Sequence, residues 1–485
     1  MNFRIRKSML AVAVSGLLAA PLAQATNGYF MHGYSTKNKG LAGAGAAFSQ
    51  DAMAAAVNPA GMAFVERRVD LGLQIFAPSP RGYTVTDPTG SLPLAPDGTP
   101  ASAFCDPPLP NGTVICRPPF TVNPGTVESE NDMFLIPHFA YNHLLNDQTT
   151  FGIAIYGNGG MNTEYKGGSA AALDPSTAPA LTYNNNLPGT YGAGTAGVNL
   201  EQMFFNFNSA YKLNEKHALG GSLLMVGQRF RAQGLENFSG LSLDPSNLSG
   251  NVNSLSWGFG AKVGYQGEVA EGVRVGFSYQ TKISMGEFDE YKGLFAEGGD
   301  FDIPSTYTLG VSFNVGETGV IVADYQRINY TDVKAISNPI SKLTSGGCFD
   351  ALSATVTNGG TPTPASGSTC LGGPDGGGFG WEDIGIIKLG YQWTAANIDW
   401  RVGYSHSDQP IPESETLFNI LAPAVIQDHI TAGMTLPVGK SQEFNLSLMY
   451  APEEKVKGTN PFDQTTQIEI EMSQWDLQAG WAWMF

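Results

Sequence analysis

Few residues of this sequence are charged, and that shortage excludes several classes of protein. Charged side chains make up 14% of the 485 residues, and 26 Lys and Arg are outnumbered by 43 Asp and Glu. Nucleic-acid binding needs clustered cations to neutralise phosphates, so a formal charge of −17 argues against it. In the body of the chain no apolar run approaches the length of about 18 residues that a membrane-spanning helix needs. A polytopic helical membrane protein is therefore excluded, whereas a β-barrel is not.

Motifs for catalysis and metal binding are also missing. The chain has four Cys and six His. It contains no Cys-x-x-Cys to suggest a zinc or redox site, and no Gly-x-Ser-x-Gly to suggest a hydrolase. No phosphate-binding glycine motif precedes a helix. We therefore expect a protein that is not an enzyme and that needs no metal or cofactor.

The N-terminus is typical of a secretory signal peptide. Arg4, Arg6 and Lys7 precede an apolar stretch, 9–20, and a small-x-small cleavage site follows at 23–25. The apolar stretch is too short to span a bilayer, which argues against a membrane anchor. We predict that residues 1–25 are removed and that the mature protein is exported.

Alternation with a period of two dominates the rest of the chain. Along 255–265 and 273–283, apolar side chains alternate with Gly, Ser, Gln and isolated charges. Successive side chains of a strand point to opposite faces, so one face is apolar and the other polar. The polar face suits a wet or ligand-filled barrel interior. Such segments are expected at 69–77, 134–144, 150–157, 200–212, 217–230, 254–266, 272–284, 305–315, 319–331, 384–394, 397–406, 428–437, 442–451 and 474–485.

The connections between these segments alternate in length. Short turns, such as 146–148, 214–216 and 439–441, alternate with connections of about twenty to fifty residues. Bacterial outer-membrane barrels have an even number of strands, short periplasmic turns and long external loops. The sequence therefore predicts an all-β fold, a transmembrane antiparallel β-barrel of about 14 strands over residues 69–485.

The four cysteines fall in two of the long connections. Three pairings are arithmetically open, and we favour the two local ones, Cys105 with Cys116 and Cys348 with Cys370. Disulfides are permitted in an exported protein.

Residues 26–68 do not alternate and contain a compact run of small residues. The segments 39–47, 51–52 and 58–61 resemble the N-terminal hatch of the FadL/TodX family of outer-membrane transporters for hydrophobic molecules. The terminal Phe485 resembles the signal recognised by the barrel assembly machinery of Gram-negative bacteria. We therefore expect a hatch, or plug, over residues 26–68 inside the barrel. Its marker residues are Gly40, Gly43, Gly45, Asp51, Asn58, Pro59, Ala60 and Gly61.

The resemblance implies a route for a ligand. In that family a hydrophobic ligand is captured at outer loops and leaves sideways beside an irregular third strand. Here the third strand runs into a glycine-rich stretch, which is either this opening or an ordinary loop. The residues of the expected opening are Gly157, Asn158, Gly159 and Gly160. Those of the expected capture groove, unless they only pack a loop core, are Phe238, Leu241, Leu243, Leu248, Phe288, Leu294 and Phe295.

The family also holds an acidic headgroup with internal cations. Alternation places four cations on polar strand faces, where they could bind a ligand or merely neutralise acids, namely Lys262, Arg274, Lys282 and Arg401. Near the mature N-terminus, Tyr29 and Phe30 are the expected ligand contacts.

We therefore expect a monomer in the outer membrane of a Gram-negative bacterium, in contact with outer-membrane lipids. Its expected cargo is long-chain fatty acids or hydrocarbons. A general diffusion porin and an exporter of oxidised fatty acids are the alternatives, and an outer-membrane lipid hydrolase is a weaker one.

Overall fold

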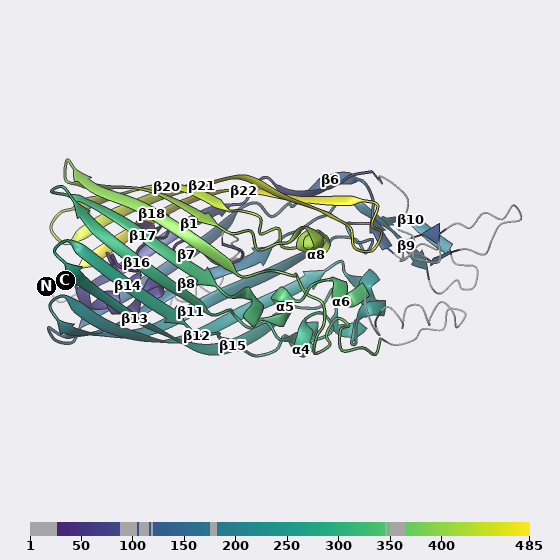
Figure 1. Cartoon of the computed structure of the whole chain (residues 1–485), viewed down its shortest axis with the longest axis horizontal. Helices are drawn as coiled ribbons and strands as arrows, with labels where there is room; N and C mark the ends of the chain where they lie inside the picture. Colours follow the sequence, from purple (N-terminus) through teal and green to yellow (C-terminus); the bar gives the residue numbers. More distant parts are fainter. Residues whose placement is uncertain are drawn as a thin grey trace, which may run out of the picture.

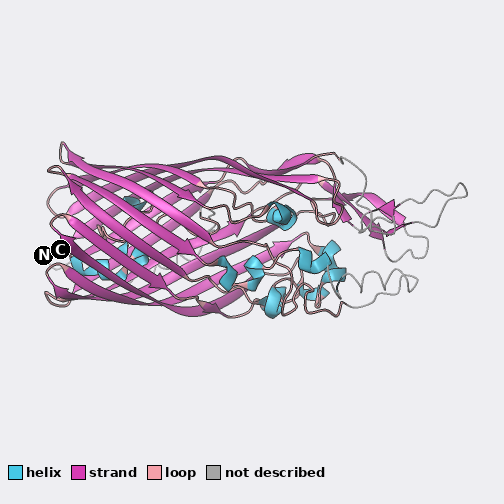
Figure 2. Ribbon diagram, viewed as in Figure 1, coloured by secondary structure: helices cyan, strands magenta, loops and turns pink. Residues whose placement is uncertain are grey.

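Fourteen strands form one closed antiparallel barrel (Figures 1 and 2). The structure is a computed structural model that describes residues 27–87, 104–105, 116–117, 120–174, 182–344, 348 and 365–485. The predicted signal peptide lies outside these residues. The first strand pairs with the last, from Arg68↔Met484 to Ala77↔Trp475, and this pairing closes the barrel. The predicted fold class is confirmed.

Each barrel strand pairs with the next one along the chain. In ring order the strands are β1 (Arg68–Ala77), β7 (Phe134–Leu144), β8 (Thr149–Asn162), β11 (Gly197–Asn214), β12 (His217–Gln233), β13 (Ser254–Ala270), β14 (Val273–Gln280), β16 (Thr306–Val315), β17 (Gly319–Ile328), β18 (Ile384–Ala395), β19 (Ile398–Ser407), β20 (Asp428–Val438), β21 (Gln442–Thr459) and β22 (Gln467–Met484).

Alternation along the strands separates the two barrel faces as predicted. On β13, Leu255, Trp257 and Phe259 are 68%, 54% and 60% exposed on the outer face. Between them, Ser256 and the nearby Lys262 are buried on the inner face. An apolar outer band and a polar lumen are the arrangement expected of a barrel in lipid.

Short turns and long connections lie at opposite ends of the barrel. The C-terminus lies at the end with the short turns (Figure 1). At the other end, strand extensions and short helices fill the long connections. None of the described helices is long or apolar enough to cross a membrane. These elements are β2 (Arg81–Val85), β3 (Phe104–Cys105), β4 (Cys116–Arg117), β5 (Phe120–Val122), β6 (Gly125–Glu128), β9 (Ser169–Asp174), β10 (Thr182–Pro188), η3 (Glu236–Leu241), η4 (Pro245–Asn247), β15 (Ser284–Met285), η5 (Asp289–Tyr291), α4 (Ala296–Gly299), η6 (Tyr330–Asp332), α5 (Lys334–Ser337), α6 (Ser341–Thr344), η7 (Glu413–Glu415) and α8 (Thr416–Asn419).

Several strand ends differ from the prediction. β8 continues through the glycine-rich stretch to Asn162, because β11 pairs with it along that whole length. β14 ends at Gln280, four residues early, because the pairing is interrupted there before β15 resumes it with β13 in the same direction. β21 and β22 are longer than predicted because they pair with each other up to Thr459↔Gln467.

Residues 27–65 lie inside the barrel; most of them lie toward the end with the short turns (Figure 1), whereas the first few reach the long loops. This hatch contains three short helices, α2 (Thr36–Lys39), α3 (Ala54–Val57) and η1 (Pro59–Phe64). Small residues allow the hatch to touch the wall backbone directly. A Cβ on Gly276 of β14 would lie 2.0 Å from the carbonyl oxygen of Ala46, and one on Gly220 of β12 would lie 2.3 Å from the backbone nitrogen of Ala60. Only glycine at these wall positions therefore leaves room for the backbone of the hatch.

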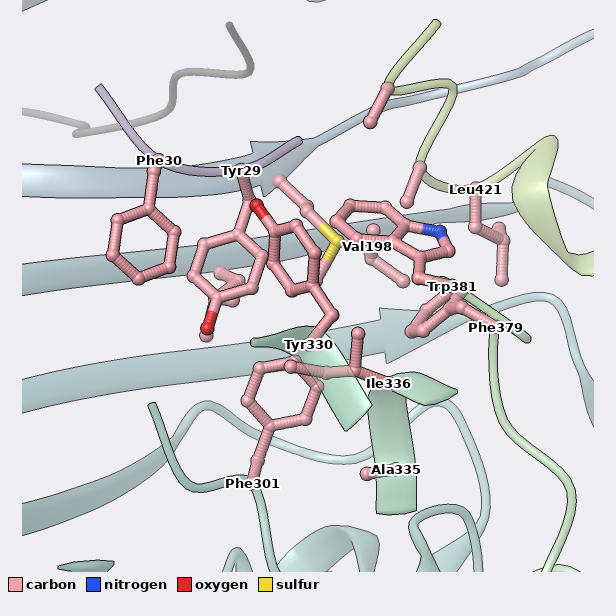
Figure 3. Packing of buried hydrophobic residues seen from close by; sticks show 14 of the residues in the cluster. Tyr29, Phe30, Val198, Phe301, Tyr330, Ala335, Ile336, Phe379, Trp381 and Leu421 are labelled. Atoms are coloured by element: carbon pink, nitrogen blue, oxygen red, sulfur yellow. The ribbon is translucent and has the colours of Figure 1, made fainter. Parts of the chain in front are cut away.

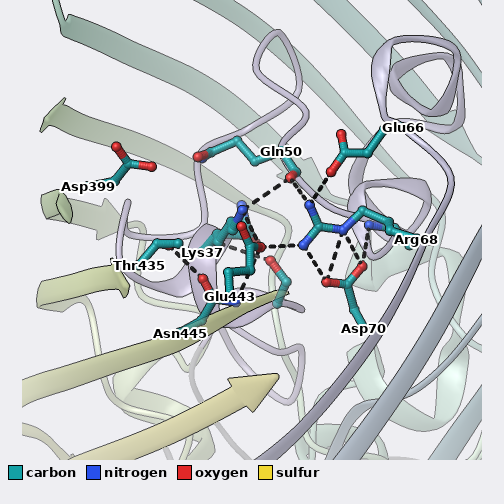
Figure 4. A network of polar contacts seen from close by, with 12 residues as sticks. Lys37, Gln50, Glu66, Arg68, Asp70, Asp399, Thr435, Glu443 and Asn445 are labelled. Atoms are coloured by element: carbon teal, nitrogen blue, oxygen red, sulfur yellow. Dashed lines mark hydrogen bonds and ion pairs between the residues drawn. The ribbon is translucent and has the colours of Figure 1, made fainter. Parts of the chain in front are cut away.

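Buried ion pairs join the hatch to the wall. Lys37 of α2 lies 2.6 Å from the Glu443 carboxylate of β21, which also binds Arg68 of β1 (Figure 4). The Arg68 guanidinium lies 2.7 Å from Asp70 as well. A second pair joins Lys39 to Asp476 of β22, with both side chains 1% exposed. Because a buried charge is costly without a partner, these pairs hold the hatch in one position.

Candidate functional site

An apolar pocket lies among the long loops. It encloses about 460 Å³ of space, part of which is open to solvent. None of the described residues that line it is charged. Most ligand pockets combine such an apolar lining with a few polar groups, and this one offers almost only hydrocarbon. Its wall includes Phe230, Leu235, Phe238, Leu248, Phe295 and Phe418.

The structure sorts the predicted groove residues into three groups. Phe238, Leu248, Leu294 and Phe295 line this outer pocket. Phe288 and Leu241 are buried behind it, and the Phe288 ring stacks on Phe230 with centroids 5.3 Å apart. Leu243 is 40% exposed and does not line this pocket, so its role as a groove residue stays a prediction. Its amide donates to the carbonyl of Leu371 at 3.0 Å.

A cluster of aromatic side chains lies directly beneath the outer pocket (Figure 3). The Tyr29 ring of the hatch has its centroid 5.7 Å from Tyr330, 6.0 Å from Trp381 and 6.3 Å from Phe301. Phe30 packs against Tyr29 at 5.1 Å. The hatch therefore contributes two rings to a cluster otherwise built by the long loops.

Hydrogen bonds fix the polar ends of this aromatic cluster. The Tyr330 hydroxyl donates to the carbonyl of Asn27 at 2.6 Å. The Trp381 indole donates to the side-chain oxygen of Asn419 at 2.6 Å. The first of these bonds ties the start of the hatch to a long loop, so movement of that loop and movement of the hatch are mechanically linked.

Hydrogen-bond pairing in the barrel wall is interrupted between β7 and β8, and we call this interruption the window. The two strands pair only from Phe139↔Ile155 to Leu144↔Thr150. Above this point, described residues 134–138 pair with β1 but not with β8, and 156–162 pair with β11 but not with β7. The chains meet again where the backbone of Glu130 donates to Glu164 at 2.9 Å. Pro137 lies within the unpaired edge, where a residue without an N–H is tolerated.

The start of the hatch lies against the β8 edge of this window. The Met31 amide donates to the Asn158 carbonyl at 2.6 Å, and the Gly160 amide donates to the Tyr29 carbonyl at 3.1 Å. A Cβ on Gly159 would lie 1.6 Å from the Tyr29 carbonyl oxygen, so only glycine permits this approach. The four residues of the predicted opening, 157–160, all lie along this edge.

Asn158 is an extra residue in β8. Gln202 of β11 is opposite Gly159, whereas the next residue, Met203, is opposite Gly157. The register therefore shifts by one residue at Asn158, which is a β-bulge. Bulges redirect side chains and interrupt pairing, and here the bulge coincides with the loss of pairing to β7.

A second pocket, the lumen pocket, lies between the hatch and the opposite wall. It contains about 400 Å³ of space, part of which is open to solvent, and its lining includes His32 and Tyr34 of the hatch and Lys262 and Lys388 of the wall. Lys388 donates to the His32 carbonyl at 3.3 Å, and Lys262 donates to the Ala56 carbonyl. Within the described part of the chain neither lysine forms an ion pair. Asp324 partly compensates the charge of Lys388, and the remaining positive charge favours binding of an anionic group.

The four predicted cations have different surroundings. Lys262 alone lines the lumen pocket. Arg274 lies in a cavity at the end with the short turns. Arg401 is buried and donates to Thr435 at 2.7 Å and to Gln50 of the hatch at 3.0 Å, so it supports the hatch.

The prediction that Lys282 faces the lumen is wrong. Because β14 ends at Gln280, Lys282 lies in the loop, where it is 42% exposed in an ion pair with Asp302 at 2.7 Å. Lys388 was missed, although it lies between outward-facing Ile387 and Leu389 and the same alternation rule identifies it.

Comparisons with known proteins show which proteins the chain is similar to. A family model described as outer membrane protein transport protein (OMPP1/FadL/TodX) matches residues 16–179. The long-chain fatty acid transport protein of Escherichia coli (strain K12) is 23% identical over 363 residues, which cover 70% of this chain and 75% of that protein. Its counterpart from Salmonella typhi is 23% identical over 358 residues, or 70% and 74%. The chain is similar to proteins of the FadL/TodX family.

Solved structures of this family share the fold. The crystal structure of the P. putida toluene transporter TodX aligns with a TM-score of 0.61 and 16% identity, covering 94% of this chain and 99% of that one. A Pseudomonas aeruginosa FadL homologue aligns with a TM-score of 0.59 and 14% identity, covering 94% and 100%. Barrels of this kind in the bacterial outer membrane have their long loops outside the cell and their short turns in the periplasm, and we name the two ends of this barrel accordingly.

A disulfide secures one long loop. Cys348 and Cys370 are bonded in the connection between β17 and β18 that also carries Trp381. The backbones of Cys105 and Cys116 are paired residues of β3 and β4, and their side chains lie outside the described part of the chain.

Acidic residues in a second external loop respond to pH. Burial, and next the Asp302 carboxylate, raise the pKa of Asp300 from 3.8 to about 7. The hydrogen bond to Asp302 raises the pKa of Lys282. In the folded loop Asp300 therefore holds a proton, between pH 3.8 and about 7, that it loses when the loop unfolds. The free energy of unfolding of the loop therefore falls as the pH rises from 3.8 to about 7.

We predict that this pH dependence disappears in Asp300→Asn. For the wild type, the hydrogen–deuterium protection factors of residues 281–305 should be lower above about pH 7 than between pH 3.8 and about 7. For the variant, the protection factors in the two pH ranges should be equal. Asp289→Asn, which removes an exposed carboxylate from the same loop, is the matched control and should behave as wild type. Equal pH dependence in all three proteins would contradict this assignment.

We also predict that Phe238→Asp combined with Phe295→Asp weakens binding of palmitate. Each ring buries apolar area worth about 1.5–3 kcal/mol, so the Kd should rise at least about 10-fold. Isothermal titration of detergent-solubilised protein measures it, with circular dichroism to verify the barrel. Leu243→Asp, outside the pocket, is the control. An unchanged Kd in the double variant would assign the pocket residues to loop packing alone.

Proposed function

We propose that this protein carries long-chain fatty acids or related hydrophobic compounds across the outer membrane and releases them sideways into the bilayer. The observation that carries the proposal is the window between β7 and β8, with the start of the hatch along its edge. The names of the relatives, a long-chain fatty acid transport protein and a toluene transporter, agree with this cargo class.

Capture begins at the outer pocket. Its uncharged, aromatic lining favours hydrocarbon, and each methylene removed from water there contributes about 0.8 kcal/mol. The inner side of the outer pocket contains Val198, Phe379 and Leu421, which border the aromatic cluster in Figure 3. A ligand that moves inward therefore next meets Tyr29 and Phe30, the two residues expected from sequence to contact it.

Passage requires the hatch to rearrange. Tyr29 and Phe30 are 0% and 1% exposed, and they pack between the long loops and the edge of β8. Displacing the segment 29–31 would break its two backbone hydrogen bonds to β8 and free the window. The ion pairs of Lys37 and Lys39 hold the remainder of the hatch, so a local shift of its first residues suffices.

The lumen pocket accounts for acidic cargo. Lys262 and Lys388 present two ammonium groups to a space that also contacts Tyr34, three residues from Met31. A carboxylate held there would leave its alkyl chain near the window. Cargo without an acidic group would not use these lysines, and both classes would share the outer pocket.

Lateral release suits an apolar molecule. Leaving through the wall keeps the hydrocarbon out of periplasmic water, whereas passage along the barrel axis would expose it. The transport is passive, because no nucleotide-binding motif is present and a conduit of this kind follows the concentration gradient.

Deleting Asn158 tests the lateral route. Removal of the bulge residue lets Gly157 and Gly159 continue in one register with β11, which favours a straight β8 that pairs with β7. We predict that palmitate uptake into liposomes containing the variant falls to that of protein-free liposomes, while palmitate binding to detergent-solubilised protein persists. Asn158→Ala, which keeps the bulge length, is the control and should retain uptake. Normal uptake after the deletion would contradict lateral release.

A further inference from the structure

A chain of buried side-chain hydrogen bonds crosses the inner wall from the hatch to an external loop. The Tyr34 hydroxyl donates to the side-chain oxygen of Asn158 at 3.1 Å. The Asn158 amide donates to Gln202 of β11 at 3.2 Å, and the Gln202 amide donates to Gln228 of β12 at 3.2 Å. The Gln228 amide then donates to the backbone carbonyl of Phe301 at 3.0 Å. Every link points the same way.

The three amide side chains are shielded from solvent. Asn158, Gln202 and Gln228 are 1%, 0% and 3% exposed. Gln228 also donates to the Ser256 hydroxyl of β13 at 3.1 Å, so the chain contacts four adjacent strands. Buried amides need partners, and each of these depends on its neighbour for one of them. A change at one end therefore alters the hydrogen bonding of the next residue along the chain.

Three residues of this hydrogen-bonded chain lie at the lumen pocket, at the aromatic cluster and at the window. Tyr34 lines the lumen pocket. Phe301 belongs to the aromatic cluster below the outer pocket, with its ring 4.8 Å from Phe295 and 6.3 Å from Tyr29. Asn158 is the bulge at the window edge. The chain thus joins both pockets to the irregular part of β8.

We propose that Gln202 and Gln228 are positioning residues that couple the external loop at Phe301 to the bulge at Asn158. When a ligand in the outer pocket displaces Phe295 and Phe301, Gln228 loses its carbonyl acceptor. Its amide then reorients toward Ser256, the bond to Gln202 weakens, and the bulge is less firmly held. The opening step of this coupling rests on the proposed lateral route, whereas the positioning of the bulge does not.

The proposed coupling differs from a local hydrogen-bonding role of Gln228 in which residues a change at Gln228 affects. A purely local role for Gln228 would affect β12 and its immediate neighbours. The proposed role extends to residues 157–162 on β8, two strands away, and to the hatch residue Tyr34.

The test uses Gln228→Met, which preserves side-chain length but removes the donor and the acceptor. Gln266→Met on β13 is the matched control, because Gln266 is also buried on the lumen face but accepts only from Ser49, outside the chain. Hydrogen–deuterium exchange of residues 157–162 is measured in lipid nanodiscs, with and without palmitate. Thermal unfolding of each variant checks that the barrel is intact.

We expect faster exchange of residues 157–162 in ligand-free Gln228→Met than in wild type or Gln266→Met. Palmitate should speed exchange there in wild type and add nothing in Gln228→Met. Tyr34→Phe should raise the same exchange, and its effect should not add to that of Gln228→Met. Equal ligand-free exchange in Gln228→Met and wild type would overturn the positioning role, whatever the cargo or exit route. If only the palmitate response of wild type is missing, the coupling to ligand is overturned, while the positioning role stands or falls on the ligand-free comparison. Normal liposome uptake by the Asn158 deletion separately identifies a failure of the lateral route.

Discussion

The structure depends on one constraint, that backbone polar groups at membrane depth must find hydrogen-bond partners within the protein. A closed barrel normally meets it strand by strand, and here β7 and β8 fail to do so over part of their length. The start of the hatch supplies part of the missing pairing through Tyr29 and Met31. The same backbone segment thus completes the wall and places two aromatic rings beneath the outer pocket. A ligand that displaces those rings would therefore also disturb the backbone hydrogen bonds that join the hatch to β8.

The rest of the hatch is held more firmly than its first residues. Its alanines and glycines touch wall glycines at backbone distance, and its lysines are paired with buried acids of β21 and β22. Such contacts are expensive to break, because each would leave an unpaired buried charge. The hatch therefore combines a firmly held body with a short leading segment held by two backbone bonds and by ring packing. This division allows a small movement at the window without loss of the plug.

Much of the fold follows from sequence, and the reason is geometric. Side chains in a strand alternate strictly, so the outward face of β13 or β14 is visible in the order of residues alone. Alternation says which face a residue occupies but nothing about depth or neighbours. It therefore grouped Lys262, Arg401 and Lys282, which the structure places in the lumen pocket, against the hatch and in an external loop. The window was indicated only by glycines at 157–160, because the interruption also depends on β7, where Pro137 was the unnoticed signal. The amide chain joins residues from four separate segments, and no local pattern contains it.

The central claim is that hydrophobic cargo leaves through the wall between β7 and β8. Photolabelling in lipid nanodiscs tests it most directly, with a palmitate analogue that carries a diazirine on its alkyl chain and with mass spectrometry to locate the adducts. The account predicts adducts on residues 134–138 and 156–162, together with the outer pocket, and a loss of the former when Asn158 is deleted. Adducts that avoid both window edges and instead follow the lumen to the cavity around Arg274 at the periplasmic end would contradict it.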